Sequence, residues 1–217
     1  MAVNSELYQS ISQTLATQNV QLIAVSKTKP NEDIQALYQM GQRAFGENYV
    51  QEAVEKIKRL DQLRPWLEWH FIGPVQSNKT SEIAEHFDWI HTIDREKIAQ
   101  RLSDQRQAHS RLGPLQACVQ VNISQEESKS GVMPNETLQL CKVVASLPGL
   151  VLRGLMAIPA PSTNETEQRE AFAALRHLFE DIRVQTQKVP GFEDFDTLSM
   201  GMSDDLEAAI AEGATMV

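Results

Sequence analysis

Four residues of this chain have side chains or backbone groups that could hold a small ligand. Lys27 lies just past the apolar residues 22–25, and a neutral lysine amine can attack a carbonyl carbon. Ser199, Gly201 and Ser203 share one short segment near the other end of the sequence. Gly201 would let backbone amides approach a ligand, and Ser203 could cap a helix whose free N–H groups favour a phosphate. The chemistry predicted from these residues is bond formation with a carbonyl compound, or the binding of a phosphate.

Each of these residues also has a plainer interpretation. Lysines usually extend along the surface with the charged end in water. The position of Lys27 by itself fits a surface lysine and a ligand-binding lysine equally well. Lys29 has the same strand parity but precedes a proline, so we expect it in the loop. Ser203, followed by Asp204 and Asp205, is sufficient for an ordinary helix cap. The two acids would repel a phosphate unless they face away.

The histidines, Glu47 and the cysteines indicate no further chemistry. The five histidines lack the spacing of metal ligands, so we expect no metal site. His70 could face the mouth of the fold, although a hydrogen-bonded core histidine is the commoner case. Glu47 could serve as an acid or base, or could be exposed or bonded to an Asn or Ser. Cys118 and Cys141 are far apart and typical of small buried residues in a reducing compartment.

Short apolar runs alternate with longer amphipathic stretches along the whole chain. The predicted strands cover residues 22–25, 43–45, 69–72, 89–91, 115–123, 151–156 and 197–199. The predicted helices cover residues 5–16, 30–40, 48–60, 77–87, 94–107, 135–147, 165–187 and 203–211. Residues 215–217 look like the opening of an eighth strand.

This alternation predicts an α/β fold: a single-domain TIM-type (β/α)8 barrel over residues 1–217, with a leading N-terminal helix. An open doubly wound sheet is the alternative, but no GxGxxG motif follows the first strand. Functional groups of such barrels lie at the carboxyl ends of the strands, where the residues above fall. The eighth strand is cut short at Val217, and we expect that the given sequence is trimmed, because a missing strand leaves unpaired edges.

The composition limits the partners of this chain. Its net charge is -9 and its pI is near 5.1, which argue against a nucleic acid or an anionic membrane as the main partner. No apolar run approaches the roughly 20 residues of a membrane span, and the first residues do not resemble a secretory signal. We expect a cytoplasmic location and a monomer.

Taken together, the strand-end segments resemble those of the pyridoxal phosphate homeostasis proteins. The resemblance runs in order through nearly the whole sequence, and its segments are residues 24–30, 45–52, 69–79, 121–124, 129–131, 154–159 and 199–204. It implies a fold-type III barrel that binds pyridoxal 5′-phosphate (PLP), like the alanine racemase N-terminal domain. In this family the chain continues into an Arg-x-Gly-Thr-like strand that approaches the pyridine nitrogen and the phosphate.

The resemblance also implies roles for individual residues. Lys27 would carry PLP as a Schiff base, Asn48 and Met156 would lie near the ring, and Ser199, Gly201 and Ser203 would lie by the phosphate. We assign no catalytic residue. We expect a PLP-binding protein of vitamin B6 and amino-acid homeostasis that performs no turnover. Its partners would be PLP, with apo-PLP enzymes or a regulatory protein.

An enzyme is the second hypothesis. A racemase needs proton donors on both faces of its substrate, and the enzymes that the chain resembles supply the second donor from a partner subunit and a further β domain. A low-activity amino-acid racemase or lyase remains the alternative, because a group such as Glu47 could still move a proton.

Overall fold

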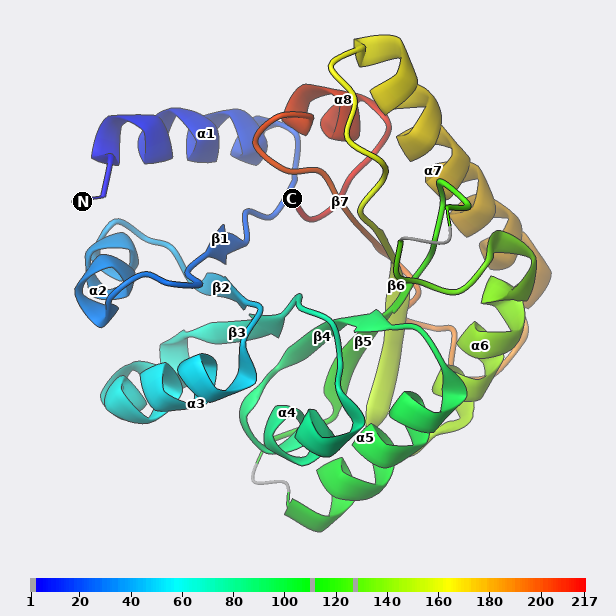
Figure 1. The fold of residues 1–217 in the computed structure, drawn as a ribbon, viewed down its shortest axis with the longest axis horizontal. Helices are drawn as coiled ribbons and strands as arrows, with labels where there is room; N and C mark the ends of the chain where they lie inside the picture. Colours follow the sequence, from blue (N-terminus) through cyan, green and yellow to red (C-terminus); the bar gives the residue numbers. More distant parts are fainter. Residues whose placement is uncertain (1–2, 110–111, 127–128) are drawn as a thin grey trace.

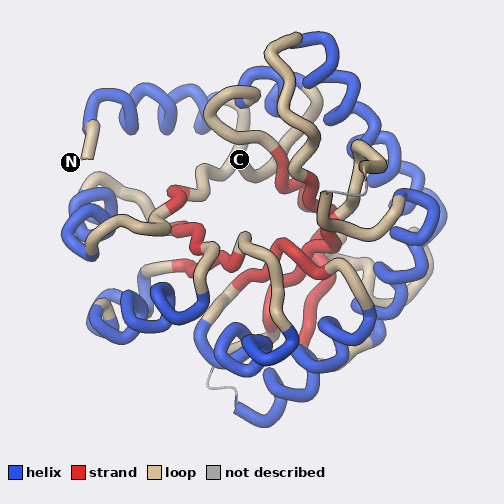
Figure 2. Tube along the Cα trace, viewed as in Figure 1, coloured by secondary structure: helices blue, strands red, loops and turns tan. Residues whose placement is uncertain are grey.

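The architecture is a parallel sheet that curls around a common interior and is covered by helices on its outside (Figures 1 and 2). The computed structural model describes residues 3–109, 112–126 and 129–217. Within them, seven strands pair in the order of the chain, each parallel to the next. A doubly wound sheet would reverse its strand order part-way, so the predicted barrel-type fold is confirmed and the open alternative is wrong.

The elements alternate along the chain as the sequence predicts. The strands are β1 (Ala24–Val25), β2 (Ala44–Glu47), β3 (Glu68–Phe71), β4 (Trp89–Ile93), β5 (Leu115–Gln120), β6 (Leu150–Ala157) and β7 (Thr197–Met200). The α-helices are α1 (Ser5–Thr17), α2 (Asn31–Gln39), α3 (Val50–Arg59), α4 (Thr80–His86), α5 (Glu96–His109), α6 (Pro134–Ser146), α7 (Glu165–Thr186) and α8 (Leu206–Ala211). Two 3₁₀ helices, η1 (Asp61–Trp66) and η2 (Ser77–Lys79), complete the set in the described residues.

Residues 215–217 bridge the two edges of the sheet. On one side the amide of Met200 donates to the carbonyl of Met216 at 3.1 Å. On the other side the amide of Ile23, just before β1, donates to the carbonyl of Val217 at 2.8 Å. Residues 215–217 therefore take the place predicted for the opening of an eighth strand, as a short segment that bonds to both β7 and the residues before β1.

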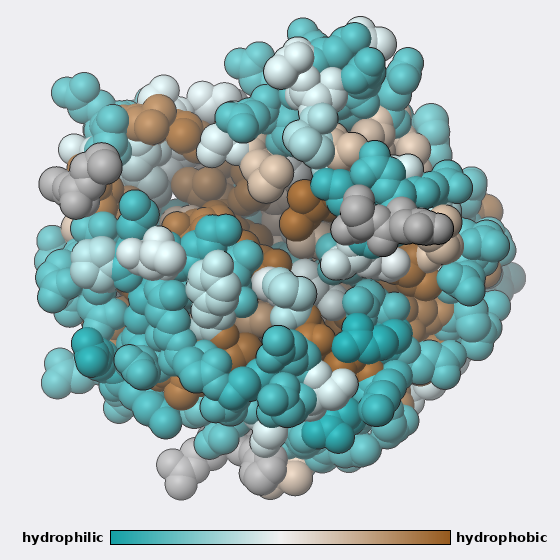
Figure 3. Space-filling model, viewed as in Figure 1, coloured by the Kyte–Doolittle hydropathy of each residue, from teal (hydrophilic) through white to brown (hydrophobic). Residues whose placement is uncertain are grey.

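The core has an outer and an inner part. The outer part lies between the sheet and the helices, which bury residues at three- and four-residue intervals, such as Val50, Ala53, Val54 and Ile57 of α3. The inner part is a smaller cluster, made of Ile23, Ala44, Trp89, Cys118, Met156 and Met216. In Figure 3 polar residues cover the outside of the molecule, and apolar residues are visible in a hollow near the middle of the view.

Two predicted helices differ from the structure. Residues 77–87 divide into η2 and α4. The last helix begins at Leu206, not at Ser203, because the Asp205 carboxylate accepts a hydrogen bond from the Met202 amide at 2.6 Å and holds residues 203–205 in a turn. Among the described residues, no helix combines the length and apolar character needed to cross a lipid bilayer.

Candidate functional site

A cavity of about 180 Å³ lies at the carboxyl ends of β1, β6 and β7. Five of the six residues predicted from the sequence line it, namely Lys27, Asn48, Met156, Ser199 and Gly201. Most of its other lining is apolar, and three side chains at its mouth are strongly exposed: Val25 (49%), Ile158 (42%) and Met202 (55%). An apolar cavity with a few convergent polar groups is the usual form of a small-ligand site.

A buried ion pair fixes the backbone that leads to Lys27. Ser26 is 4% exposed, and its hydroxyl donates to Glu47 Oε1 at 2.6 Å. Lys56, on α3, donates from Nζ to the Ser26 carbonyl at 2.6 Å and to Glu47 Oε1 at 2.8 Å. Lys27 itself is exposed and lines the cavity, so it extends from an anchored backbone.

The next turn of this loop is held by a second carboxylate. Glu52 accepts from Lys56 Nζ at 2.6 Å and from the backbone amide of Thr28 at 2.6 Å. Thr28 has a φ of 62°, a conformation that a β-branched residue rarely adopts without such support. Lys29 is exposed and lies outside the cavity lining, in the loop as expected.

Glu47 is part of this anchor. It is fully buried, which rules out the solvent exposure that the sequence left open, and its hydrogen-bond partners are Ser26 and Lys56. Burial raises the pKa of Glu47, although Lys56 and Ser26 oppose the rise. Of the interpretations left open by the sequence, the hydrogen bond to a serine is the correct one.

On the far wall, Ser199 is bonded to a buried histidine. His91 Nδ1 lies 2.8 Å from Ser199 Oγ, and His91 Nε2 lies 2.9 Å from His70 Nδ1. Both imidazoles are fully buried, so the expectation of a core histidine at position 70 is confirmed. Burial and the neighbouring His70 hold the pKa of His91 well below its usual value.

Gly201 follows β7 at the rim. Its φ is +101°, and a Cβ at this position would lie 2.5 Å from the Ala209 Cβ on α8. Only glycine therefore lets this segment pass so close to α8. The expectation that Ser203 caps the last helix is wrong, because the residue before α8 is Asp205. Ser203 is exposed and does not line the cavity.

Asp205 is a cavity residue that the sequence named only as an acid that would repel a phosphate unless it faced away. It lines the cavity while its carboxylate accepts from the Met202 amide, so its negative charge would weaken the binding of a phosphate there. Asn48 contributes an amide oxygen, Oδ1, that is buried without a hydrogen-bond partner in the described part of the chain. The site therefore offers one unused acceptor and one carboxylate beside Lys27.

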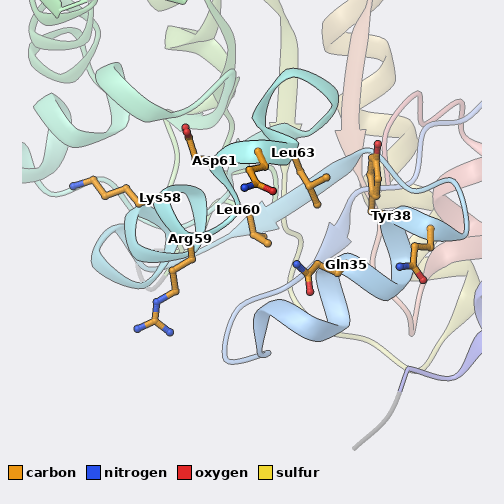
Figure 4. Close-up of a pocket in the computed structure, with 9 residues that line it drawn as sticks. Gln35, Tyr38, Lys58, Arg59, Leu60, Asp61 and Leu63 are labelled. Carbon is orange, nitrogen blue, oxygen red and sulfur yellow. The ribbon is translucent and has the colours of Figure 1, made fainter.

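A second, larger hollow of about 540 Å³ lies between α2, α3 and η1 (Figure 4). Its basic residues, Lys58 and Arg59, are exposed and point away from Tyr38 and Leu63 in the close-up. None of the described polar residues that line it is buried, so this hollow has the character of ordinary surface. The described residues also hold no cluster of three His, Cys, Asp or Glu suited to a metal ion.

Known proteins resemble this chain over most of its length. The family described as alanine racemase, N-terminal domain, matches residues 6–217. The pyridoxal phosphate homeostasis protein of Pasteurella multocida (strain Pm70) is 57% identical over 198 residues, which cover 91% of this chain and 82% of that protein. Its counterpart from Escherichia coli (strain K12) is 52% identical over 201 residues, 92% of this chain and 82% of that protein. The chain belongs to the pyridoxal phosphate homeostasis protein family.

Solved structures of this family share the fold. PipY of Synechococcus elongatus PCC7942, with PLP bound, superimposes with a TM-score of 0.83 at 36% identity and covers 95% of this chain and 94% of that one. PipY without PLP gives a TM-score of 0.85 at 37% identity over the same shares. Alanine racemase from Corynebacterium glutamicum gives a TM-score of 0.69 at 15% identity, which shows a likeness of fold alone, over 95% of this chain and 57% of that one.

In this member of the pyridoxal phosphate homeostasis protein family, sequence reasoning gave no site role to Lys56 or His91, and it did not place Asp205 in the cavity. Lys56 reads as one more charge on an amphipathic helix, and nothing in its spacing marks it as buried. The histidines left a usable signal, because His70 and His91 lie on neighbouring strands with the parity of the barrel interior.

Proposed function

We propose that this chain holds PLP in the cavity through a Schiff base on Lys27, and that it carries vitamin B6 rather than turning over a substrate. The observation that carries the proposal is the convergence of Lys27, Asn48, Met156, Ser199 and Gly201 on one cavity. The PLP-bound structure of the relative PipY supports the choice of ligand.

The lining residues fit the parts of PLP. Lys27 would hold the aldehyde carbon, and the partnerless Oδ1 of Asn48 would accept a hydrogen bond from the ligand near its ring. Met156, at the end of β6, would cover the ring with an apolar side chain. The phosphate would lie by the Ser199 hydroxyl and Gly201, and not by Ser203, which lies outside the cavity lining. When bound, the group supplies an aldehyde that exchanges readily between amines.

The arrangement of acids supports a carrier over an enzyme. Racemisation needs a proton donor on each face of the substrate. Glu47 is buried against Lys56 and Ser26 and is not part of the cavity lining. Of the described residues that line the cavity, Asp205 alone has a carboxylate. Asp205 is also the group that keeps the alternative, a low-activity amino-acid racemase or lyase, open to test.

The other parts of the proposal concern organisation. We infer that residues 1–217 form a single PLP-binding barrel domain, which the family match over residues 6–217 supports. We further propose a monomer in the cytoplasm, with apo-PLP enzymes or a regulatory protein as partners. The two cysteines, both free and buried, are in keeping with a reducing compartment.

Two parallel assays test the function. The PLP-loaded protein is incubated with a panel of L-amino acids, and D-isomers, amines and keto acids are measured. The same protein is mixed with an apo-PLP enzyme, whose activation is followed. We expect transfer without turnover. Turnover well above that of free PLP, abolished in Lys27→Ala, would establish the enzyme instead.

A further inference from the structure

Four polar side chains form a line through the interior of the barrel, from the amino end of β3 to the ligand cavity. Glu68 Oε2 lies 3.6 Å from His70 Nε2, at ion-pair rather than hydrogen-bond distance. His70 Nδ1 lies 2.9 Å from His91 Nε2, and His91 Nδ1 lies 2.8 Å from Ser199 Oγ. We call these four residues the interior chain. Its far end, Ser199, lines the cavity.

The number of protons on the interior chain decides what Ser199 can offer a ligand. A neutral imidazole has one N–H donor and one acceptor nitrogen. With both histidines neutral, His70 places its proton on Nε2, toward the Glu68 carboxylate, because a lone pair there would face a negative charge. His70 Nδ1 then accepts from His91, and His91 Nδ1 accepts the Ser199 proton. In this state Ser199 presents only lone pairs to the cavity.

One additional proton reverses two hydrogen bonds, the one between His70 and His91 and the one between His91 and Ser199. His70 then donates from Nε2 toward Glu68 and from Nδ1 to His91, whose Nδ1–H donates to Ser199 Oγ. The hydroxyl proton of Ser199 becomes free to point into the cavity. An anion beside Ser199 is favoured in this protonated state and disfavoured in the neutral one, since a hydroxyl lone pair repels it.

We propose that His70 and His91 are positioning residues of the phosphate site, and that binding of a phosphate group at Ser199 draws one proton onto the interior chain and turns the Ser199 hydroxyl into a donor. This inference rests on the proposed location of the ligand phosphate. It adds that the ligand is bound together with a proton, so its affinity rises as the pH falls.

The surroundings of the pair place the added charge on His70. Glu68 faces it from β3, and its carboxylate also accepts from Gln21 and Trp89. Burial by itself would raise the pKa of Glu68, but His70, with Trp89 and Gln21, holds that pKa below its usual value. Glu68 is therefore an ionised carboxylate beside His70. Trp89 stacks on His70 with ring centroids 5.4 Å apart.

The other groups near the pair leave that assignment unchanged. Arg153 lies over the ring of Trp89, with its Cζ 4.9 Å from the ring centroid. Its guanidinium is paired with Asp196 at 2.7 Å. Cys118, in the same inner cluster, stays a neutral thiol because burial raises its pKa far above neutrality. Among the described residues no carboxylate is paired with His91, and its pKa is lowered by burial and by His70.

The test measures affinity and proton uptake with two probes, inorganic phosphate and PLP. Titration calorimetry in two buffers of different ionisation enthalpy gives the number of protons taken up per ligand. We expect His91→Phe and Ser199→Ala to weaken phosphate binding roughly tenfold, as the loss of one charge-assisted hydrogen bond would. We also expect both variants to lose the extra proton uptake of the wild-type protein. His177→Phe, the same change at an exposed position on α7, is the matched control.

The outcomes separate this inference from the proposed function. Unchanged affinity and proton uptake in both variants would overturn the role proposed for the interior chain, even if PLP binds at Lys27. If PLP does not attach to Lys27 but phosphate binding still depends on Ser199 and His91, the proposed function fails and the inference stands. Should His91→Phe not fold, nitrogen NMR of histidine-labelled wild-type protein decides. Phosphate should move the proton of the His91 ring from Nε2 to Nδ1, and ring nitrogens that do not respond would overturn the proposal.

Discussion

The ammonium group of Lys56 lies 2.8 Å from Glu47 Oε1, and both groups also bond Ser26, the residue before Lys27. A buried cation and a buried anion therefore hold the backbone from which the proposed PLP lysine extends. Removing one member of such a pair leaves the other charge uncompensated, which costs far more than removing an exposed pair.

For this reason we expect Lys56→Met to destabilise the protein by about 3–5 kcal/mol and to weaken PLP binding at Lys27. Denaturant unfolding and PLP titration measure the two effects. Lys58→Met, the same change at an exposed position of α3, should alter neither. Equal stability of the Lys56 and Lys58 variants would contradict the role of the pair.

We expect Lys27→Ala to fold normally and to lose the covalent PLP adduct. Lys27 is exposed and contributes little to the core, so the circular dichroism spectrum should not change. Melting should differ only by the stability that bound PLP adds through mass action. Borohydride reduction and peptide mapping of the wild-type protein should find the pyridoxyl group on Lys27. Finding it on Lys29 or Lys79 instead would refute the assignment.

We expect Asp205→Asn to tighten the binding of PLP and of inorganic phosphate several-fold. The substitution removes a negative charge from the cavity, and one charge at short range is worth about 1 kcal/mol in a well-solvated site. The asparagine oxygen can still accept the Met202 amide, so the turn before α8 should persist. Asp204→Asn, at the exposed neighbouring position, serves as the control. Weaker binding in the Asp205 variant would argue that this carboxylate contacts a positive part of the ligand.

We expect Gly201→Ala to reduce both stability and PLP affinity, because the new Cβ would press on Ala209 at 2.5 Å and displace the rim segment from α8. Gly41→Ala isolates the backbone effect: its φ is +104°, yet in the described part of the chain no atom beyond its sequence neighbours lies within 4 Å of the added Cβ. Both variants should lose about 1–2 kcal/mol to backbone strain. Only the Gly201 variant should also lose affinity, as measured by PLP titration.

The pH dependence of stability should change in Glu212→Gln. Arg169, and after it Arg176, lower the pKa of Glu212, with burial opposing them. A carboxyl group whose pKa is lowered by folding stabilises the protein above its unfolded pKa, and this contribution is lost as the pH falls through the folded pKa. The variant should therefore be less stable than the wild type at pH 7, and the difference should shrink in acid. Denaturant unfolding between pH 7 and pH 3 measures it, and a constant difference would contradict the linkage.

Much of the fold could be predicted because its signals are local. Each βα unit has its own apolar run and amphipathic helix, and parallel strands joined by helices have few possible arrangements. The ends of the strands could be found in the same way, which is why Lys27, Asn48, Met156, Ser199 and Gly201 were predicted at one rim. Ser203 was wrongly predicted to cap the last helix. The hydrogen bond from the Met202 amide to Asp205 holds a turn there instead, and the spacing of apolar residues does not reveal that turn.

The sequence by itself therefore determined the order of strands and helices, the barrel-type sheet and the rim at which polar residues gather. Only the tertiary structure decided which charges are buried and what they contact. Lys56 meets Glu47 and Ser26 across three elements, and His70 reaches Ser199 through His91, on strands that lie far apart in the sequence. Such contacts depend on side-chain direction inside the curled sheet, where desolvation makes each partner obligatory. The strand pattern shows that His70 and His91 can share the interior face, but it does not show what either ring bonds.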